Sequence, residues 1–415
     1  MHSIVNIAMR FNAHLGGWPG TVCPIFALLA TSLCARTGGA ANHDPSHLLG
    51  DPEALSHPEE LPVAPQKTSI VFRAEKNGYQ FNLHSYLTRY EGKFWSIWSS
   101  GLTHEDSPKQ LIRYAFSEDG HHWSDSGIVT EPEVNPKAQG VCIARGVFVL
   151  DGELTALVAF FEKRSELSPT TAPDRAAYPE GWPDIWSNLK LVKFVWDGQE
   201  WKDKGVFLDN CMSNFPPRPI DGRLVMTCRD SKVKLSTVIS EDQGGGNWTR
   251  TILPGAPPGD FLTESSWYVD PEGVVHLLGR DDRRSKYLYH SLSRDNGLTW
   301  ETPVRTNYPD AMSKNFTGRL SNGWYFLINN PVRTGRSTRD PMAISFSRDG
   351  WTFGNPLAVR KNAPPQRFPG RSKSPDSFQY MHALEFEGAL WVVYSTNKED
   401  IEISEFRITD ILPSN

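Results

Sequence analysis

The chain has 415 residues, with 43 Lys and Arg against 48 Asp and Glu, so its formal net charge is −5. This mild acidity argues against a nucleic-acid binder, and an ordinary apolar share of 39% excludes intrinsic disorder. Aromatic residues are numerous (14 Trp, 12 Tyr and 21 Phe), as are Gly and Pro, at 33 and 31. Because aromatic residues favour strands and Gly and Pro favour turns, the composition predicts an all-β protein.

The first 45 residues differ from the rest of the chain. Residues 24–35 form a short apolar run, and small residues follow at Ala35, Gly38, Gly39, Ala40 and Ala41. Such a run is too short to span a membrane and is typical of a signal-peptide core. We therefore expect residues 1–45 to be a leader and the protein to be secreted or periplasmic. Residues 46–67, rich in Pro, His and acidic residues without periodicity, are predicted to be a disordered linker.

Cys23 and Cys34 lie in the expected leader, so the mature chain keeps Cys142, Cys211 and Cys228. An odd set of this kind is neither a disulfide scaffold nor a metal-binding motif. We expect buried free thiols, with a single Cys211–Cys228 disulfide as the alternative.

Five turn motifs recur beyond residue 68, and the fullest, at 293–300, has the pattern S-x-D-x-G-x-T-W. In these Asp boxes the carboxylate is expected to accept hydrogen bonds from amides of its own turn, and the Gly takes a positive φ. The closing aromatic packs between sheets. The last four closing aromatics, at 201, 248, 300 and 353, are separated by 47, 52 and 53 residues. This spacing is typical of four-stranded propeller blades, and we expect the boxes to be structural rather than catalytic.

The number of blades follows from a second regularity. A Gly separates the first two predicted strands of each unit, and these glycines are Gly92, Gly152, Gly222, Gly273, Gly323 and Gly388. The count predicts a single six-bladed β-propeller over residues 68–412. Residues 69–72 are expected to supply the outer strand of the last blade and so close the ring, which removes exposed sheet edges.

A fixed distance from each hairpin Gly selects the residues at the mouth of the propeller, where ligand groups collect around the axis. The rule selects a converging set of charged and polar residues, namely His84, Arg145, Asn214, Arg229, Ser265 with Glu264 beside it, Arg280, Asn315, Asn330, Tyr380 and His382. Arg218 joins this set because it lies four residues along from Asn214, on the same face of the strand. Four arginines in one place predict a site for an anion, best matched by a carboxylate held in bidentate pairs. The alternative is that some of these arginines bridge blades through Asp230, Asp281 or Asp282.

Several catalytic signatures are missing from the sequence. We find no pair of carboxylates suitably placed for ordinary glycoside hydrolysis, although some hydrolases dispense with that pair. A metal-binding His/Glu helix, a phosphate loop and a G-x-S-x-G nucleophile elbow are missing too.

Several runs resemble the rhamnosyl-glucuronate lyase family of secreted sialidase-like propellers. They are FNLHSY around His84, WSSG at 98–101, NFPPRP around Arg218, YMHALE around His382 and VYSTNKEDIEIS at 393–404. The resemblance covers about residues 70–408. It implies removal of terminal L-rhamnose α-1,4-linked to D-glucuronate, and it implies seven blades where the direct count gives six. True sialidases carry an early Arg-Ile-Pro run, whereas here Arg73 precedes Ala74-Glu75.

The resemblance also implies a catalytic His and Arg, which correspond to His84 and Arg145, with Arg218 as a second carboxylate contact. Uronate β-elimination needs arginines to neutralise the carboxylate and groups that move two protons. His84 can provide one proton transfer, and Tyr380 or His382 the other. We expect Arg218, Arg229, Arg280, Asn214, Glu264, Asn315 and Asn330 to bind substrate.

Two other functions remain open at this stage: an exo-glycoside hydrolase of sialidase-like or rhamnosidase-like type, and a non-catalytic propeller lectin for acidic glycans. We expect no cofactor, with calcium in the central channel as an alternative. The expected partner is an acidic oligo- or polysaccharide, with neither nucleic acid nor membrane as a partner after leader removal. The protein is expected to be a monomer.

Overall fold

The computed structural model describes residues 43–107, 109–132, 139–163, 186–242, 246–255, 262–283, 285–332, 339–370 and 374–413. It divides the chain into two units, Met1–Asn42 and His43–Asn415. The predicted leader lies outside the described residues except for its last three positions. None of the short helices in the described ranges has the length or the apolar character needed to cross a membrane.

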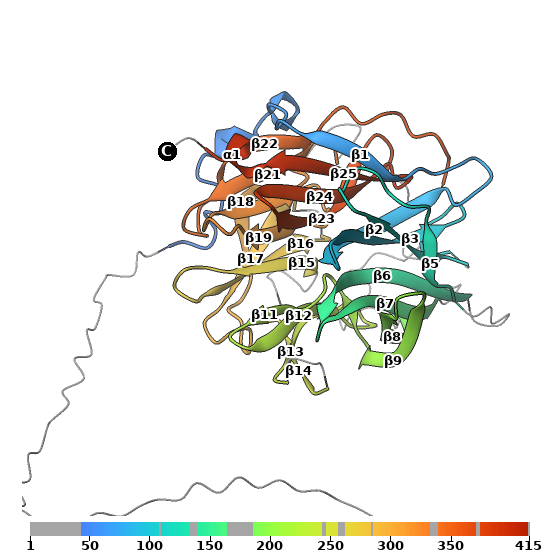
Figure 1. Ribbon diagram of the computed structural model, residues 1–415. Coiled ribbons are helices and arrows are strands. Elements are labelled where there is room, and N and C mark those ends of the chain that lie inside the picture. The colour runs from blue at the N-terminus through green and yellow to red at the C-terminus, as the bar shows by residue number, and fades with distance from the viewer. Residues whose placement is uncertain are drawn as a thin grey trace, which may run out of the picture. The chain divides into compact units, whose positions relative to one another are not determined.

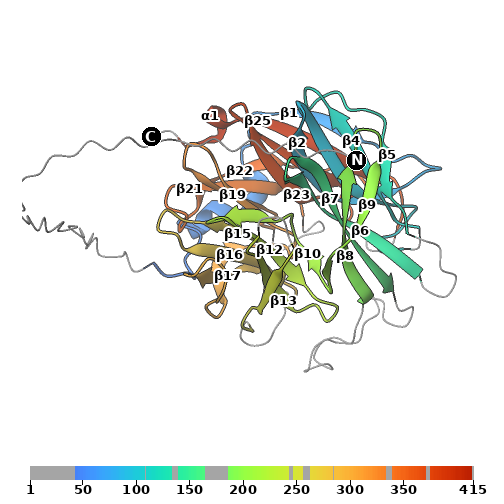
Figure 2. The ribbon, with the colours of Figure 1, turned by 60° about the horizontal axis from the view of Figure 1, so that its bottom comes forward.

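Six antiparallel sheets lie in a ring around a central axis, as Figures 1 and 2 show. The first blade contains β2 (Phe81–Tyr90), β3 (Lys93–Gly101), β4 (Leu111–Ser117) and β5 (Gly127–Thr130). The second contains β6 (Gln139–Leu150), β7 (Glu153–Lys163), β8 (Trp186–Trp196) and β9 (Trp201–Asp209). The third contains β10 (Met212–Ser213) and β11 (Arg218–Ile220), β12 (Arg223–Arg229), β13 (Leu235–Ser240) and β14 (Trp248–Ile252).

The other three blades repeat the same order of strands from the axis outward. The fourth contains β15 (Leu262–Val269), β16 (Val275–Asp281), β17 (Tyr287–Ser293) and β18 (Val304–Pro309). The fifth contains β19 (Phe316–Arg319), β20 (Tyr325–Asn329), β21 (Met342–Ser347) and β22 (Gly354–Arg360). The sixth contains β23 (Phe378–Phe386), β24 (Ala389–Thr396), β25 (Asp400–Arg407) and β1 (Lys67–Phe72). A single helical turn, α1 (Ile408–Ile411), follows β25.

The ring closes as the sequence predicts. β1 pairs antiparallel with β25, so the first strand of the chain completes the last blade. Inner strands of successive blades contact one another around the axis, including β2 with β23 across the closure. The six-blade count is therefore confirmed, and the seven blades implied by the family resemblance are wrong for this chain.

The Asp boxes lie in the turns between the third and fourth strands. In the box that follows β17, Oδ1 of Asp295 accepts a hydrogen bond of 2.8 Å from the Thr299 amide and another of 2.8 Å from the Ser293 hydroxyl. Gly297 has a φ of +90°, and the closing Trp300 is buried. The turns thus form as predicted, by satisfying their own polar groups and burying their aromatic residue.

The segment that precedes β1 is not the disordered linker that we predict from its composition. It contains two 3-10 turns, η1 (Pro52–Leu55) and η2 (Pro58–Glu60), and its leucines Leu48, Leu49, Leu55 and Leu61 are buried. Leu49 and Val63 form parallel bridges with Phe353 and Ala358 in blade five. The linker prediction is wrong because a few spaced leucines, hidden in a Pro- and His-rich composition, bury enough apolar surface to hold the segment.

The cysteines also differ from the favoured expectation. Cys211 and Cys228 form a disulfide, with their Cα atoms 5.4 Å apart, whereas Cys142 is a buried free thiol. The disulfide links Cys211, next to the interrupted inner strand of blade three, to β12. It therefore stabilises the part of that blade where the inner strand hydrogen-bonding is incomplete.

Candidate functional site

The inner strands depart from regular pairing near the mouth of the propeller. Register shifts occur in β2, β6, β15 and β23, and they contain His84, Arg145, Glu264 and Tyr380, respectively. A β-bulge turns a side chain away from the direction that strand alternation would give it. His84 and Tyr380 also have left-handed φ values of +58° and +59°. Four blades thus use local irregularities to present four candidate site residues.

His84, Arg145 and Tyr380 come together from three blades. All three are buried, with relative exposures of 4%, 2% and 7%, and the rings of His84 and Tyr380 meet edge to face at 5.0 Å. Burial, and next the Arg145 charge, lowers the pKa of His84 well below its ordinary value. Burial raises the pKa of Tyr380 above that of an ordinary tyrosine. The imidazole is therefore neutral and the phenol protonated near neutral pH.

Polar atoms of this trio lack partners in the protein. Nδ1 of His84 and both Nε and Nη1 of Arg145 are buried and make no hydrogen bond to any residue that the structure describes. Unpaired buried donors are costly, and they cluster at functional sites where a ligand satisfies them. The geometry thus fits a site that is completed by a polar ligand.

A glutamate organises the arginines of blades three and four. Glu264 lies 2.7 Å from Nη1 of Arg280 and 3.6 Å from Nη2 of Arg229, and Nε of Arg280 lies 2.6 Å from Asp282. Burial alone would raise the pKa of Glu264, but Arg280 and Arg229 hold it below its usual value. Nη1 of Arg280 also lies 3.3 Å from the Tyr380 hydroxyl. Arg280 is thus neutralised by two carboxylates, whereas Arg229 shares only one of them.

Besides Lys314, which is described below, the sequence analysis missed three charged residues of the cluster: Glu105, Arg339 and Lys398. Arg339 lies 5.7 Å from the Tyr380 ring and donates from Nη2 to the Met312 carbonyl at 3.0 Å. Lys398 pairs with Glu105 at 2.5 Å, which joins the sixth blade to the first. All three lie in loops between second and third strands, which open at the mouth, so inspection of those loops for charge could have found them.

The structure places the three predicted asparagines between blades. Nδ2 of Asn214 donates to Thr227 and Ser265, with the Ser265 bond at 3.1 Å. Nδ2 of Asn315 reaches the Leu278 carbonyl at 3.3 Å, and Nδ2 of Asn330 reaches the Phe378 carbonyl at 2.9 Å. These amide donors join neighbouring blades, whereas the Oδ1 atom of each of the three side chains is buried and makes no hydrogen bond to a residue that the structure describes. The substrate binding that we predict for them therefore stays a prediction.

Arg218 and His382 lie deeper along the axis than we predict. The Arg218 guanidinium donates to the backbone carbonyls of Trp267 and of Thr317, the latter at 3.1 Å. His382 lies 4.7 Å from Phe316, and its Nδ1 accepts a hydrogen bond from the Leu87 amide at 3.2 Å. Burial lowers the pKa of Arg218 to about 9 and that of His382 to about 3. Arg218 is thus a bridge between blades, and His382 packs among aromatic rings.

The charge of the cluster is strongly unequal. Its basic residues are Arg145, Arg229, Arg280, Arg339 and Lys398, and its acidic residues are Glu105, Glu264 and Asp282. Lys314 lies beside them, but burial lowers its pKa well below the ordinary value, so it is not counted as a fixed positive charge. A chain with a net charge of −5 therefore concentrates positive residues at one end of its axis. Such focusing favours an anionic ligand.

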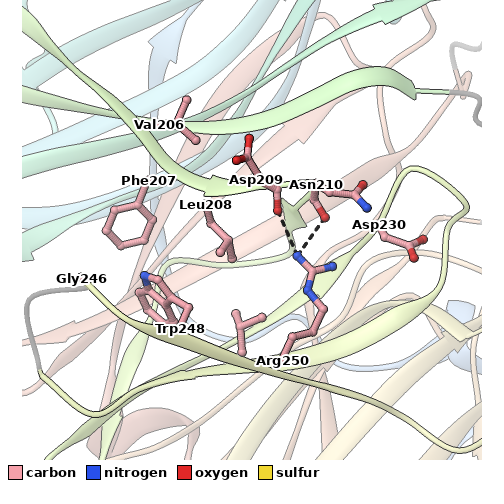
Figure 3. Close-up of a pocket in the computed structure, with 10 residues that line it drawn as sticks. Val206, Phe207, Leu208, Asp209, Asn210, Asp230, Gly246, Trp248 and Arg250 are labelled. Carbon is pink, nitrogen blue, oxygen red and sulfur yellow. Dashed lines mark hydrogen bonds between the residues drawn. The ribbon is translucent and has the colours of Figure 1, made fainter.

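A separate pocket of about 600 Å³ lies between the outer strands of blades two and three (Figure 3). Arg250 fills one side of it and donates to the carbonyls of Asp209 and Asn210 at 3.1 Å and 2.9 Å. Asp230 accepts hydrogen bonds from amides of its own turn. Because the polar groups of this pocket already make hydrogen bonds within the local structure, the axial cluster is the better candidate for the main site.

One exposed group of side chains has the residue types and the spacing of metal ligands. Within the described ranges, the His, Cys, Asp and Glu side chains close enough to share an ion are those of His57, Glu59 and Glu60. This group is exposed on η2, outside the ring of inner strands.

Comparisons with known proteins agree with this architecture. Three solved structures share the fold. A protein of unknown function from Dyadobacter fermentans is 13% identical, with a TM-score of 0.59 over 83% of this chain and 99% of that one. A sialidase is 20% identical, with a TM-score of 0.58 over 88% of this chain but only 34% of that one. An intramolecular trans-sialidase from Ruminococcus gnavus, solved with oseltamivir carboxylate, is 11% identical, with a TM-score of 0.59 over 84% and 99%.

At these identities, the likeness shows the fold alone. No curated protein matches the chain significantly. The model of the BNR repeat-like domain matches residues 92–396, which is well over half of the sequence and spans all the Asp boxes. Sequence pattern, blade count and family match coincide, and the chain belongs to the BNR repeat-like domain family.

Proposed function

We propose that this protein is a polysaccharide lyase that releases terminal L-rhamnose from an α-1,4-linked D-glucuronate. The observation that carries the proposal is the buried His84 imidazole, held neutral beside an Arg145 guanidinium with unpaired donors. A neutral base next to an unpaired cation is what proton abstraction beside a carboxylate needs. The resemblance of the runs around His84 and the Asp-box propeller supports the choice of sugar.

The arginines divide the work of holding the uronate. Arg145 has two unpaired nitrogens, and Arg229 shares its carboxylate partner with Arg280. We assign the substrate carboxylate to Arg145 and Arg229, because Arg280 is already neutralised by Glu264 and Asp282. Their positive charge stabilises the negative charge that grows on the carboxylate as the C5 proton leaves.

Elimination then moves two protons and breaks one bond. His84 takes the C5 proton, and the electron pair of the C5–H bond forms the C4–C5 double bond. The C4–O4 bond breaks, and O4 leaves with the rhamnose after receiving a proton from the Tyr380 hydroxyl, which His84 can restore. Burial keeps that hydroxyl protonated until O4 develops charge. His382 is not used, because its ring packs among aromatic side chains.

The test separates elimination from hydrolysis directly. The protein is incubated with gum arabic, and products are analysed by ultraviolet absorption and mass spectrometry. We expect free rhamnose together with an unsaturated uronate, which lacks one water relative to the hydrolysis product. Rhamnose released beside a saturated uronate would overturn the elimination mechanism.

A second candidate, an exo-glycoside hydrolase of sialidase type, is favoured by one observation. Nη1 of Arg280 contacts both Glu264 and the Tyr380 hydroxyl. Sialidases use a tyrosine nucleophile, and a carboxylate close by can take its proton. Turnover of a sialyl reporter glycoside that is lost in Tyr380→Phe would support this candidate over the lyase. Glycan binding that survives His84→Ala, without turnover by the wild type, would instead indicate a lectin.

A further inference from the structure

Below the proposed catalytic trio, a lysine that the sequence analysis did not select crosses the axis. Lys314 precedes β19 in blade five, and its side chain is among the largest fully buried ones, with 1% exposure. Its Nζ donates to the Tyr86 hydroxyl of blade one at 2.8 Å. The same Nζ lies 4.5 Å from the Tyr86 ring and 3.9 Å from the Phe215 ring of blade three. A buried lysine is rare unless its amine has a defined task.

The Tyr86 hydroxyl connects three blades. It donates its single proton to the Asn214 carbonyl at 2.9 Å, so it can only accept from Lys314. The Arg145 guanidinium lies beside the same hydroxyl. Burial raises the pKa of Tyr86 to about 12, and the charge and side-chain hydrogen bond of Arg145 oppose that rise. The phenol oxygen therefore joins Lys314, Arg145 and the backbone of blade three.

This junction also fixes one end of the bulge that presents His84. Regular pairing of β2 with β3 stops at Leu83 and resumes at Tyr86, opposite Ile97. Leu83 packs with Phe81 and Tyr380 on the other side of the bulge. A tyrosine whose hydroxyl is held by Lys314 and by the Asn214 carbonyl leaves the bulge little freedom, whereas a tyrosine held only by packing could rotate.

We infer that Lys314 is a positioning residue for the proposed reaction: through the Tyr86 hydroxyl it holds Arg145 and the His84 bulge in the geometry that proton abstraction requires. Lys314 itself does not touch the substrate. The inference rests on the proposed function, because the geometry it protects is that of His84 and Arg145. Small misplacements of catalytic groups cost large factors in rate, so the effect belongs in kcat rather than in KM.

The test compares Lys314→Met, Tyr86→Phe and the double variant on the rhamnosyl-glucuronate substrate. Met keeps the apolar stem over Phe215 but cannot donate, and Phe keeps the ring but removes the hydroxyl. Each single variant is expected to lower kcat about 10- to 100-fold with KM changed less than about twofold. The double variant is expected to be no slower than the slower single one, because both changes break the same junction.

The control is Tyr308→Phe, which removes another fully buried tyrosine hydroxyl. The Tyr308 hydroxyl lies 2.6 Å from that of Ser345, and the Tyr308 ring packs in a hydrophobic cluster of blades four and five that includes no residue of β2. The change should leave kcat unchanged. If Tyr308→Phe and Tyr86→Phe lost the same share of kcat, the loss would be a general effect of damage to the core, and the inference would be overturned. Full additivity of the Lys314 and Tyr86 changes would overturn it too, because the two residues would then act independently.

A second readout does not need turnover. The NMR signal of the His84 imidazole, assigned by its absence in His84→Gln, should shift in Lys314→Met and Tyr86→Phe and stay in place in Tyr308→Phe. If the wild type turns over the substrate, the kcat of Lys314→Met and Tyr86→Phe tests the positioning role, and a wild-type kcat in both variants overturns it. If the wild type is inactive, the proposed function fails, and an unmoved imidazole signal in both variants overturns the inference separately. Should Lys314→Met not fold, Tyr86→Phe carries the same test.

Discussion

The Asp-box turns and the mouth ends of the inner strands differ in how far they repeat from blade to blade. The boxes of Asp119, Asp295 and Asp349 share one hydrogen-bonding pattern, in which a carboxylate accepts from its own turn and a Ser hydroxyl meets the Gly amide. At the mouth, the bulges in β2, β6, β15 and β23 present a His, an Arg, a Glu and a Tyr. In this propeller of repeated blades, we take the repeated turns as the scaffold and the departures at the inner strands as the proposed site.

The two regions also differ in how their polar groups are satisfied. Asp295 accepts hydrogen bonds from its turn and has a pKa below its ordinary value, with burial opposing the shift and Thr299 and Ser293 causing it. In contrast, His84 and Arg145 keep buried nitrogens that make no hydrogen bond to any of the described residues. The carboxylate of this box is thus satisfied within its own turn, whereas the two mouth residues keep buried donors that a ligand could satisfy. Each prediction below separates these two roles.

The largest expected effect comes from exchanging a histidine at each region. His84→Gln removes the proposed base and should lower kcat by about 10²- to 10⁴-fold, the usual contribution of general acid–base catalysis. His122→Gln changes a histidine that caps Asp119 at a box turn and should leave kcat unchanged. Initial rates of unsaturated uronate formation measure both. Equal activity of the two variants would show that the mouth is not the site.

A second comparison separates an arginine with unpaired donors from one that bridges blades. Arg145→Gln should reduce kcat/KM by about 10²- to 10³-fold through loss of charge stabilisation, with little change in melting temperature. Arg218→Gln should lower the melting temperature, because it releases the carbonyls of Trp267 and Thr317, and it should leave a larger fraction of kcat/KM. Uronate binding by calorimetry checks the assignment, which fails if Arg218→Gln loses binding and Arg145→Gln keeps it.

Much of this arrangement could be predicted from the sequence. Asp-box spacing and hairpin glycines gave the six blades and the ring closure, because turn chemistry is local and repeats. Distance from the hairpin Gly found His84, Arg145, Glu264 and Tyr380, since residue count along a strand sets height along the axis. Arg218 was added because it shares a strand face with Asn214, but it lies only four residues before Gly222 and therefore deeper along the axis than the mouth.

The features that the sequence analysis missed depend on contacts between distant parts of the chain, which no local sequence pattern encodes. A bulge changes the face on which a residue lies, so counting cannot tell a proposed ligand group such as Arg145 from a blade bridge such as Arg218. Lys314 could not be predicted as part of the cluster, because its long side chain crosses the axis to Tyr86, a residue 228 positions away in the sequence. The ordered structure of the segment before β1 could not be predicted, because its leucines are buried against blades four and five, which are distant in the sequence.

The dependence of stability on pH offers a third comparison. Burial lowers the pKa of His382 to about 3, against an ordinary value of 6.5. Below pH 6.5 the unfolded chain therefore binds a proton that the folded chain does not, and stability falls by about 1.4 kcal/mol per pH unit until the folded pKa is reached. The Asp-box carboxylates, whose pKa values are lowered from 3.8, withdraw stability only when the pH falls below about that value.

Denaturant unfolding between pH 7 and pH 4.5 measures this difference. His382→Gln should flatten the slope of unfolding free energy against pH by about 1.4 kcal/mol per unit, even if it lowers the stability at pH 7. His122→Gln, at an exposed box turn, should leave the slope as it is. An unchanged slope in His382→Gln would show that this histidine titrates normally in the fold and is not enclosed by Phe316 and its neighbours.

The smallest effect is expected for a box carboxylate. Asp295→Ala removes the acceptor of the Thr299 amide and of the Ser293 and Thr299 hydroxyls. Because the turn is partly exposed and water can replace some of these bonds, we expect a loss of about 1–2 kcal/mol in unfolding free energy. Its kcat should equal that of the wild type, since β17 and β18 lie on the outer side of blade four and their box turn is at the end remote from the mouth. Thermal unfolding and initial rates test both statements together. A fall in kcat as large as that of Arg145→Gln, without a loss of stability, would mean that the repeated turns reach the site after all, and that departure from the repeat is not what marks function in this propeller.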